Sequence, residues 1–151
     1  MSKAIDFGPY SIKNVKTFKG MEGCGGFNCT IYKDGKRIGT AIDSDNGGPV
    51  LIRIQDATEY RVFIEHAKAQ PFVHDFEPDS QLINKMIDAV LHQRWLKRKC
   101  KKQTLFRLKG DPSDSFRTIS HPYCGEVMAH LRKTHGSNLI ELYNTQGEKL
   151  I

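Results

Sequence analysis

The sequence predicts an α+β fold in which helices pack on a mainly antiparallel sheet. Three observations support this: apolar residues alternate with polar ones in the first third, recur at helical spacing in the middle, and alternate again around a short helix near the end. The order β-rich, then α, then ββαβ is typical of this class. At 151 residues the chain can bury a core without metal or disulfide cross-links, so we expect a single domain over 1–151. A subdivision of this domain would separate a β-rich part, 1–56, from an α/β part, 57–151.

The first third predicts an antiparallel meander of three or four strands within residues 10–54. Asp34-Gly35 lies between two alternating runs, and this dipeptide predicts a type I′ hairpin because both central residues of that turn need a positive φ. A second break, rich in Asp and Gly, follows at 43–48. The expected strands cover 11–18, 27–32, 37–42 and 49–54.

The middle predicts two helices, over 58–68 and 81–101, and either Asp79 or Ser80 can cap the second. The second helix has a single apolar stripe, formed by Leu82, Ile83, Met86, Ile87, Val90, Leu91 and Trp95. The last third predicts strands, a short helix closed by Gly136 at the position after its end, and a polar tail. These strands are expected over 104–108, 116–120 and 138–144, with the helix over 123–134.

The formal charge is +6 and the isoelectric point is near 9.2. Much of the excess lies at the end of the second long helix and in the strand that follows, where cations occur without an acid: Arg94, Lys97, Arg98, Lys99, Lys101, Lys102, Arg107 and Lys109. Such a run attracts phosphate, nucleic acid or an acidic protein surface. The alternative is a solvated helix end whose lysines complement the helix dipole.

The strand after this run predicts an anion-binding hairpin. Arg107 and Lys109 share a strand face, Arg117 returns across a short loop, and guanidinium groups beside hydroxyls suit phosphate or carboxylate. A helix N-terminus near residues 123–125 would add N–H donors. The predicted ligand-binding set is Arg94, Lys97, Arg98, Lys101, Lys102, Arg107, Lys109, Arg117, Thr118 and Tyr123. The alternative is a solvated hairpin whose arginines pair with Asp111, Asp114 and Asp79.

Other candidate sites carry weaker signals. The glycine cluster 20–26 could cradle phosphate, but a strand follows it rather than a helix, so a loop that needs positive φ is the alternative. The 43–48 loop begins like a calcium loop, yet the position that needs an acid holds Ile54, so we expect a turn. Cys124 with His121 is a weak catalytic candidate, since a helix start and an imidazole both favour a thiolate.

No metal site or cofactor is expected. The four cysteines, Cys24, Cys29, Cys100 and Cys124, lack zinc-ligand spacing and are expected to be free thiols. No apolar run approaches the ~20 residues that span a bilayer, and the N-terminus lacks the apolar core of a secretion signal. We therefore expect a cytoplasmic protein with no membrane partner.

Short segments over most of the chain form a pattern: Asn14–Phe18, Glu22-Gly23, Gly26–Asn28, Tyr32–Lys36, Asn46–Gly48, Thr104–Gly110 and Leu131–Gly136. In this pattern the chain resembles small uncharacterised proteins of bacterial viruses and prophages. The resemblance carries over no catalytic residue. It implies an accessory protein in the cytoplasm of a bacterial host, where such proteins counter host defence by masking a host protein or sequestering a nucleotide signal.

Three functional hypotheses follow. The leading one is a non-enzymatic binding protein for a phosphate-bearing ligand, either a nucleotide signal or nucleic acid, in a counter-defence role. The second is an inhibitor that masks an acidic host protein through the basic residues and the aromatic segment Phe72–Phe76. The third is a small enzyme that uses Cys124 and His121. The sequence does not indicate an oligomeric state.

Overall fold

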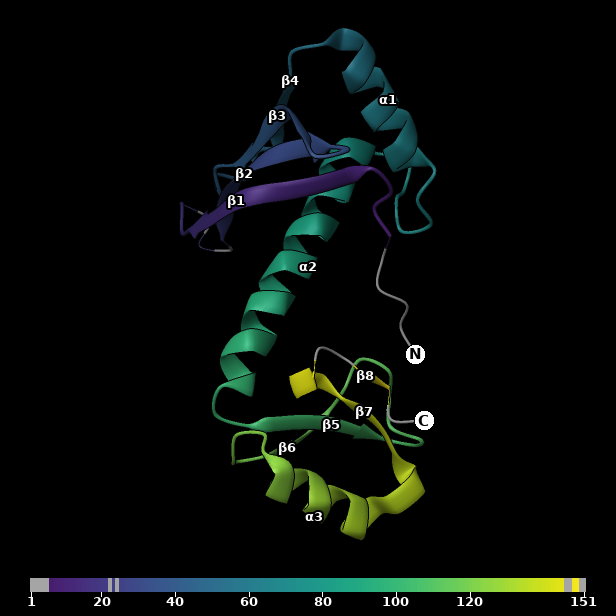
Figure 1. Ribbon diagram of the computed structural model, residues 1–151. Helices are drawn as coiled ribbons and strands as arrows, with labels where there is room; N and C mark the ends of the chain where they lie inside the picture. The colour runs from purple at the N-terminus through teal and green to yellow at the C-terminus, as the bar shows by residue number, and fades with distance from the viewer. Residues whose placement is uncertain (1–5, 22, 24, 146–147, 150–151) are drawn as a thin grey trace. The chain divides into compact units, whose positions relative to one another are not determined.

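The computed structural model describes residues 6–21, 23, 25–145 and 148–149. The described residues divide into two compact units, one up to Val90 and one from Leu91 onward. The division falls inside one long helix, α2 (Pro78–Cys100), whose first part belongs to the first unit and whose last turns belong to the second. Each unit has its own sheet (Figure 1). The α+β class is therefore confirmed, and the strands form two sheets.

The first unit is built on an antiparallel meander, as predicted. Its strands are β1 (Tyr10–Phe18), β2 (Gly26–Lys33), β3 (Lys36–Asp43) and β4 (Leu51–Ile54), paired in that order. The turn residues Asp34 and Gly35 have φ values of 50° and 79°, which confirms the Asp-Gly hairpin. β1 is irregular between Lys13 and Lys16, where Asn14 has a positive φ.

Two helices cover the inner face of this sheet. α1 (Ala57–Lys68) begins after Asp56, whose carboxylate accepts hydrogen bonds from the N–H groups of Thr58 (2.8 Å) and Glu59 (3.0 Å). α2 begins at Pro78, three residues before the predicted start, because proline suits the first helical position: its φ is preset and its missing N–H would have no partner there. Asp79 and Ser80 therefore lie in the first turn. The core joins both helices to the sheet through Phe27, Ile31, Ala41, Phe63, Ala67, Leu82, Ile83 and Met86.

The second unit surrounds the strand after α2. Its strands are β5 (Thr104–Leu108), β6 (Arg117–Ile119), β7 (Leu139–Leu142) and β8 (Glu148–Lys149), in the antiparallel order β6-β5-β7-β8. α3 (Gly125–His135) packs on the sheet and ends at Gly136, as predicted, while β8 occupies part of the expected polar tail. The second core contains Phe106, Leu108, Val127, Met128, Leu131, Leu139 and Leu142.

One side chain joins the end of α2 to the second sheet. The amide of Asn144 accepts from the N–H of Leu105 (2.7 Å) and donates to the carbonyl oxygens of Gln103 (2.7 Å) and Cys100 (3.3 Å). These bonds span the tight turn between α2 and β5. They therefore fix the end of α2 against the sheet of the second unit.

No helix in the described part of the chain is long and apolar enough to cross a membrane.

Candidate nucleic-acid interface

The last turns of α2 place cations on one side of the helix. Spacings of three and four residues align Arg94, Lys97 and Arg98 in one stripe, and Lys101 and Lys102 follow directly after the helix end. All five side chains are exposed. Among the residues that the structure describes, the four cations from Lys97 onward in this group make no ion pair, so their charge is presented to solvent. We call Lys97, Arg98, Lys101 and Lys102 the α2 cation patch.

An aromatic cluster forms around Trp95, which lies in the same turns of α2. The Trp95 ring stacks on His92, with centroids 5.8 Å apart and planes 20° apart, and it contacts Phe116 at 5.3 Å. Phe116 in turn contacts Tyr143 at 5.2 Å, and Lys99 Nζ lies 5.7 Å from the centre of the Trp95 ring. The cluster is not visible in the sequence, because its members come from three separate segments. The only signal was that Trp95 ends the apolar stripe of α2.

Arg107, predicted to bind ligand, is buried in the second unit. It is 7% exposed, and both its Nε and its Nη2 lie 3.0 Å from Oε2 of Glu141 on the neighbouring strand. Arg107 and Glu141 are register partners in the β5–β7 pairing. Every residue of β5 is buried, so the strand has no exposed face that could present this guanidinium together with Lys109, which is exposed beyond the strand end.

Arg117 is exposed but already holds a carboxylate. Its Nε and Nη2 each donate to Asp111 at 2.9 Å, and the N–H of Leu108 donates to the same carboxylate at 3.0 Å. The hydrogen bond from Arg117, followed by the one from Leu108, lowers the pKa of Asp111 to about 2. Pairing with Asp111 is the alternative that the sequence left open. Thr118, next to Arg117 in the chain, and Tyr123 are exposed, and the guanidinium of Arg117 is occupied by Asp111.

Asp79, another of the predicted partners of the arginines, is bonded elsewhere. It accepts a hydrogen bond from the hydroxyl of Tyr60 at 2.7 Å, within the first unit. This bond, with burial as a smaller cause, raises the pKa of Tyr60 to about 12.

The glycine loop does form an anion cradle, and the anion belongs to the chain. The N–H groups of Gly20 (2.8 Å) and Gly25 (3.1 Å) donate to Oδ2 of Asp45, which is 4% exposed. Asp45 comes from the 43–48 loop, so its carboxylate joins the two loops that flank the β2–β3 hairpin. The glycine loop therefore binds a carboxylate of the chain itself and stabilises the fold. The 43–48 segment is a turn, as expected.

Cys124 and His121 are not brought together as a nucleophile and base. Cys124 caps the start of α3 and packs against the second core, whereas His121 Nδ1 lies 2.7 Å from the carbonyl oxygen of Pro122. His121 lines a shallow depression of about 240 Å3 at the start of α3, whose other lining residues are Ile119, Glu126, Val127 and His130. Cys124 is not among them.

The remaining thiols are also structural in their surroundings. Cys29 is buried, and Cys100 and Cys124 are half-buried; all three are free thiols, while Cys24 lies outside the described residues. Burial raises the pKa of Cys29 to about 11. Among the described side chains, no group of three or more His, Cys, Asp and Glu is placed to hold a metal ion.

The aromatic segment of the inhibitor hypothesis is only partly exposed. Phe72 packs against the first core beneath Lys85, whereas Phe76 is 77% exposed. Gln81 holds the segment through hydrogen bonds to the backbone of His74 and Phe76. A single exposed ring is a small apolar contact for a protein partner.

No protein-family model, curated protein or solved structure matches the chain.

Proposed function

We propose that the protein is a non-enzymatic nucleic-acid-binding protein and that the α2 cation patch contacts the phosphate backbone. One observation carries this proposal: in the described structure, Lys97, Arg98, Lys101 and Lys102 are exposed beside one another with no ion-pair partner. The two arginines predicted in the hairpin, Arg107 and Arg117, are instead paired with Glu141 and Asp111 of the chain.

The shape of the patch favours a polymer over a free nucleotide. A small ligand is usually held in a concave pocket of ~300–1,000 Å3 that buries most of its surface. The four cations of the patch are fully on the surface, and the depression of about 240 Å3 at α3 is lined by none of them. A phosphate backbone needs no pocket, because each contact is an exposed cation that displaces condensed counterions. Lys99, which lies between Arg98 and Lys101 in the chain, carries its Nζ 5.7 Å from the centre of the Trp95 ring, and cations beside aromatic rings are common in nucleic-acid-binding surfaces.

The test compares two pairs of exposed cations from the same unit. The variant Arg98→Gln/Lys101→Gln removes two charges from the patch, and the control Arg132→Gln/Lys133→Gln removes two charges of the same kinds from α3. Binding of labelled single-stranded and duplex oligonucleotides is followed by fluorescence anisotropy as salt is raised. Loss of two phosphate contacts should reduce the slope of log K against log salt by about 1.4–1.8, while the control should keep the wild-type slope.

Two outcomes would contradict the proposal. One is that the wild-type protein binds no oligonucleotide at low salt. The other is that the control lowers the slope as much as the patch variant, which would indicate a response to net charge alone. The viral setting that the resemblance implies places such binding in a host cytoplasm in a counter-defence role, and this setting stays a prediction.

A further inference from the structure

The outer face of the first unit's sheet carries chemistry that the α2 cation patch does not involve. Residues paired across neighbouring strands lie on the same face, so the register assigns each side chain to the inner or the outer face. The inner face holds the core. The outer face holds Ser11, Lys13, Lys16, Phe18, Asn28, Thr30, Tyr32, Arg37, Thr40, Ile42, Leu51 and Arg53.

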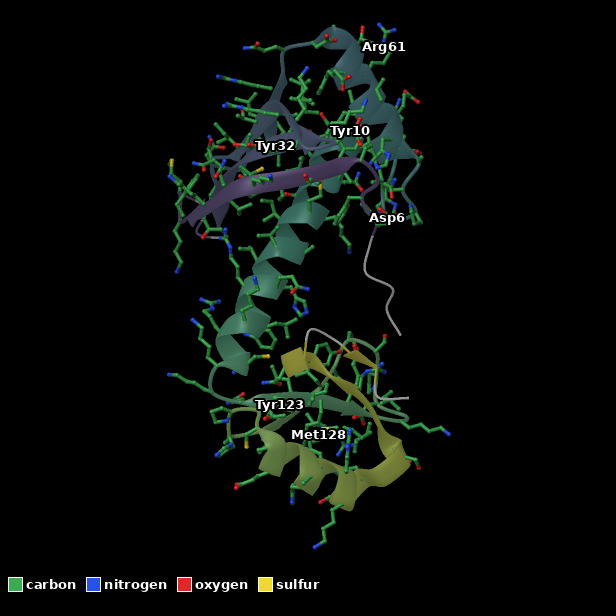
Figure 2. All side chains as sticks on the ribbon, in the orientation of Figure 1. Asp6, Tyr10, Tyr32, Arg61, Tyr123 and Met128 are labelled. Carbon is green, nitrogen blue, oxygen red and sulfur yellow. The ribbon has the colours of Figure 1, made fainter. Side chains whose placement is uncertain are left out.

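No described element covers this outer face. α1 and the start of α2 supply the helical residues of the core on the other face, and Tyr10, on that inner side, packs edge-on against Phe63 of α1 at 5.0 Å. Figure 2 shows Tyr10 toward α1 and Tyr32 on the side away from it. Two apolar side chains of the outer face are accordingly exposed, Phe18 by 40% and Leu51 by 49%.

The charge on this face has one sign. None of its positions holds Asp or Glu, whereas β1, β3 and β4 contribute Lys13, Lys16, Arg37 and Arg53, all of them exposed. Within the described part of the chain, none of these four cations makes an ion pair. An exposed surface of four cations without a carboxylate is complementary to a polyanion.

The cations flank groups that can contact bases. One row of register partners runs Lys13, Thr30, Thr40, Arg53, so two hydroxyls lie between two cations across the whole sheet. Beside this row, Tyr32 carries Lys13 Nζ over its ring at 4.7 Å, and Phe18 lies at the other end of β1. Aromatic rings offer stacking surfaces to bases of any identity, and hydroxyls can donate to or accept from base edges.

We propose that this sheet face is a binding site for single-stranded nucleic acid. The nucleic-acid strand lies across the sheet, with its phosphates against the four cations and its bases against Tyr32 and Phe18. The inference does not rest on the α2 cation patch, because the sheet belongs to the other compact unit and either surface can bind without the other.

The dimensions of the sheet favour a single strand over a duplex. Four strands span three spacings of ~4.8 Å, which is about 14 Å between the backbones of β1 and β4 before side chains are counted. The major groove of B-form DNA is only ~12 Å wide and admits a helix or a two-stranded ribbon. The face is therefore too wide to enter the major groove of an undeformed duplex, whereas an unpaired strand exposes its bases for stacking.

The test uses the full chain with the α2 cation patch neutralised (Lys97→Gln, Arg98→Gln, Lys101→Gln, Lys102→Gln), so that binding reports on the sheet. The probe is a labelled oligothymidylate of about 20 nucleotides, longer than the ~4–16 nucleotides that one small domain covers. The same strand annealed to oligodeoxyadenylate is the duplex probe. Thermal unfolding of each variant verifies that it is folded.

Two pairs of variants are compared in this background. Tyr32→Ala should weaken single-strand binding roughly 5- to 140-fold, which is the ~1–3 kcal/mol of one stacked base converted at 1.4 kcal/mol per factor of ten, while Tyr32→Phe keeps the ring and the affinity. Lys13→Gln/Arg53→Gln should lower the salt slope by about 1.4, and Lys36→Gln/Arg61→Gln, which removes two exposed cations elsewhere in the unit, should leave it unchanged. The duplex should bind more weakly than the single strand.

The outcomes separate the two proposals. If the background protein no longer binds the single strand although the wild type does, the sheet proposal is wrong and the patch proposal stands. The sheet proposal is equally wrong if Tyr32→Ala binds like Tyr32→Phe, or if the duplex binds as tightly as the single strand. If neutralising the α2 cation patch changes nothing and the sheet variants abolish binding, the patch proposal fails and the sheet proposal stands.

Discussion

Replacing Arg107 should destabilise the second unit rather than weaken ligand binding. The guanidinium is 8% exposed at its side chain and Glu141 is 15% exposed, and both donor–acceptor distances to Glu141 are 3.0 Å. Arg107→Met keeps the length of the side chain and removes the charge. Glu141 is then left as a nearly buried carboxylate without its partner.

The expected loss of unfolding free energy depends on the charged group that remains, which is Glu141. Removing one partner of a buried ion pair costs about 3–5 kcal/mol, most of it the desolvation of the group that remains. Because Glu141 keeps some contact with solvent, we expect the lower end, about 3 kcal/mol, for Arg107→Met. The double variant Arg107→Met/Glu141→Leu removes both charges and replaces them with apolar groups. It should recover most of the loss, since such replacements are often neutral or stabilising.

The assay is urea unfolding followed by tryptophan fluorescence. The chain has one tryptophan, Trp95, and it belongs to the second unit, so its emission reports on the unit that contains the ion pair. Oligonucleotide binding is measured on the same variants. The reasoning would be refuted if Arg107→Met lost less than about 1 kcal/mol of stability yet abolished binding, because Arg107 would then act on the ligand.

Three further predictions concern the joints of the fold. Asp45→Ala should lower the free energy of unfolding of the first unit by about 3 kcal/mol, because charge-assisted hydrogen bonds contribute ~1.5–3 kcal/mol each and the two part-buried hydrogen bonds to Gly20 and Gly25 are lost. Thermal unfolding against the exposed neighbour variant Ser44→Ala measures this, and equal stability of the two variants would contradict it. The pKa of Asp111 falls from 3.8 to about 2 on folding, so its contribution to stability is present above pH ~4 and is lost as pH falls toward 2. Asp111→Asn should flatten the dependence of the free energy of unfolding on pH in that window. An unchanged dependence would exclude this role. The thiol of Cys29, buried and with its pKa raised to about 11, should resist maleimide at neutral pH in the native protein and react in urea; rapid native labelling would show that the core is open.

Local patterns were enough to predict most of the secondary structure. The Asp-Gly turn, the alternation in β2 and the apolar stripe of α2 depend on residues close together in the chain, and the hairpin, strand and helix were found there. The run of basic residues that begins at Arg94 was also evident from the sequence, and the basic side chains in its helical part are exposed. These features depend on short-range sterics and periodicity, which act within a few residues.

The partners of the charged groups were decided only by the tertiary structure. Arg107 and Lys109 look equivalent on a strand face, yet β5 is covered on both faces and its register places Glu141 against Arg107. The glycine cradle is filled by Asp45 from another loop, which no spacing rule predicts. The outer face of the first sheet, with Lys13 and Arg53 in one row, exists only once four strands are in register. Whether a charge is buried with a partner or left in water depends on contacts between distant segments, and a linear sequence does not contain those distances.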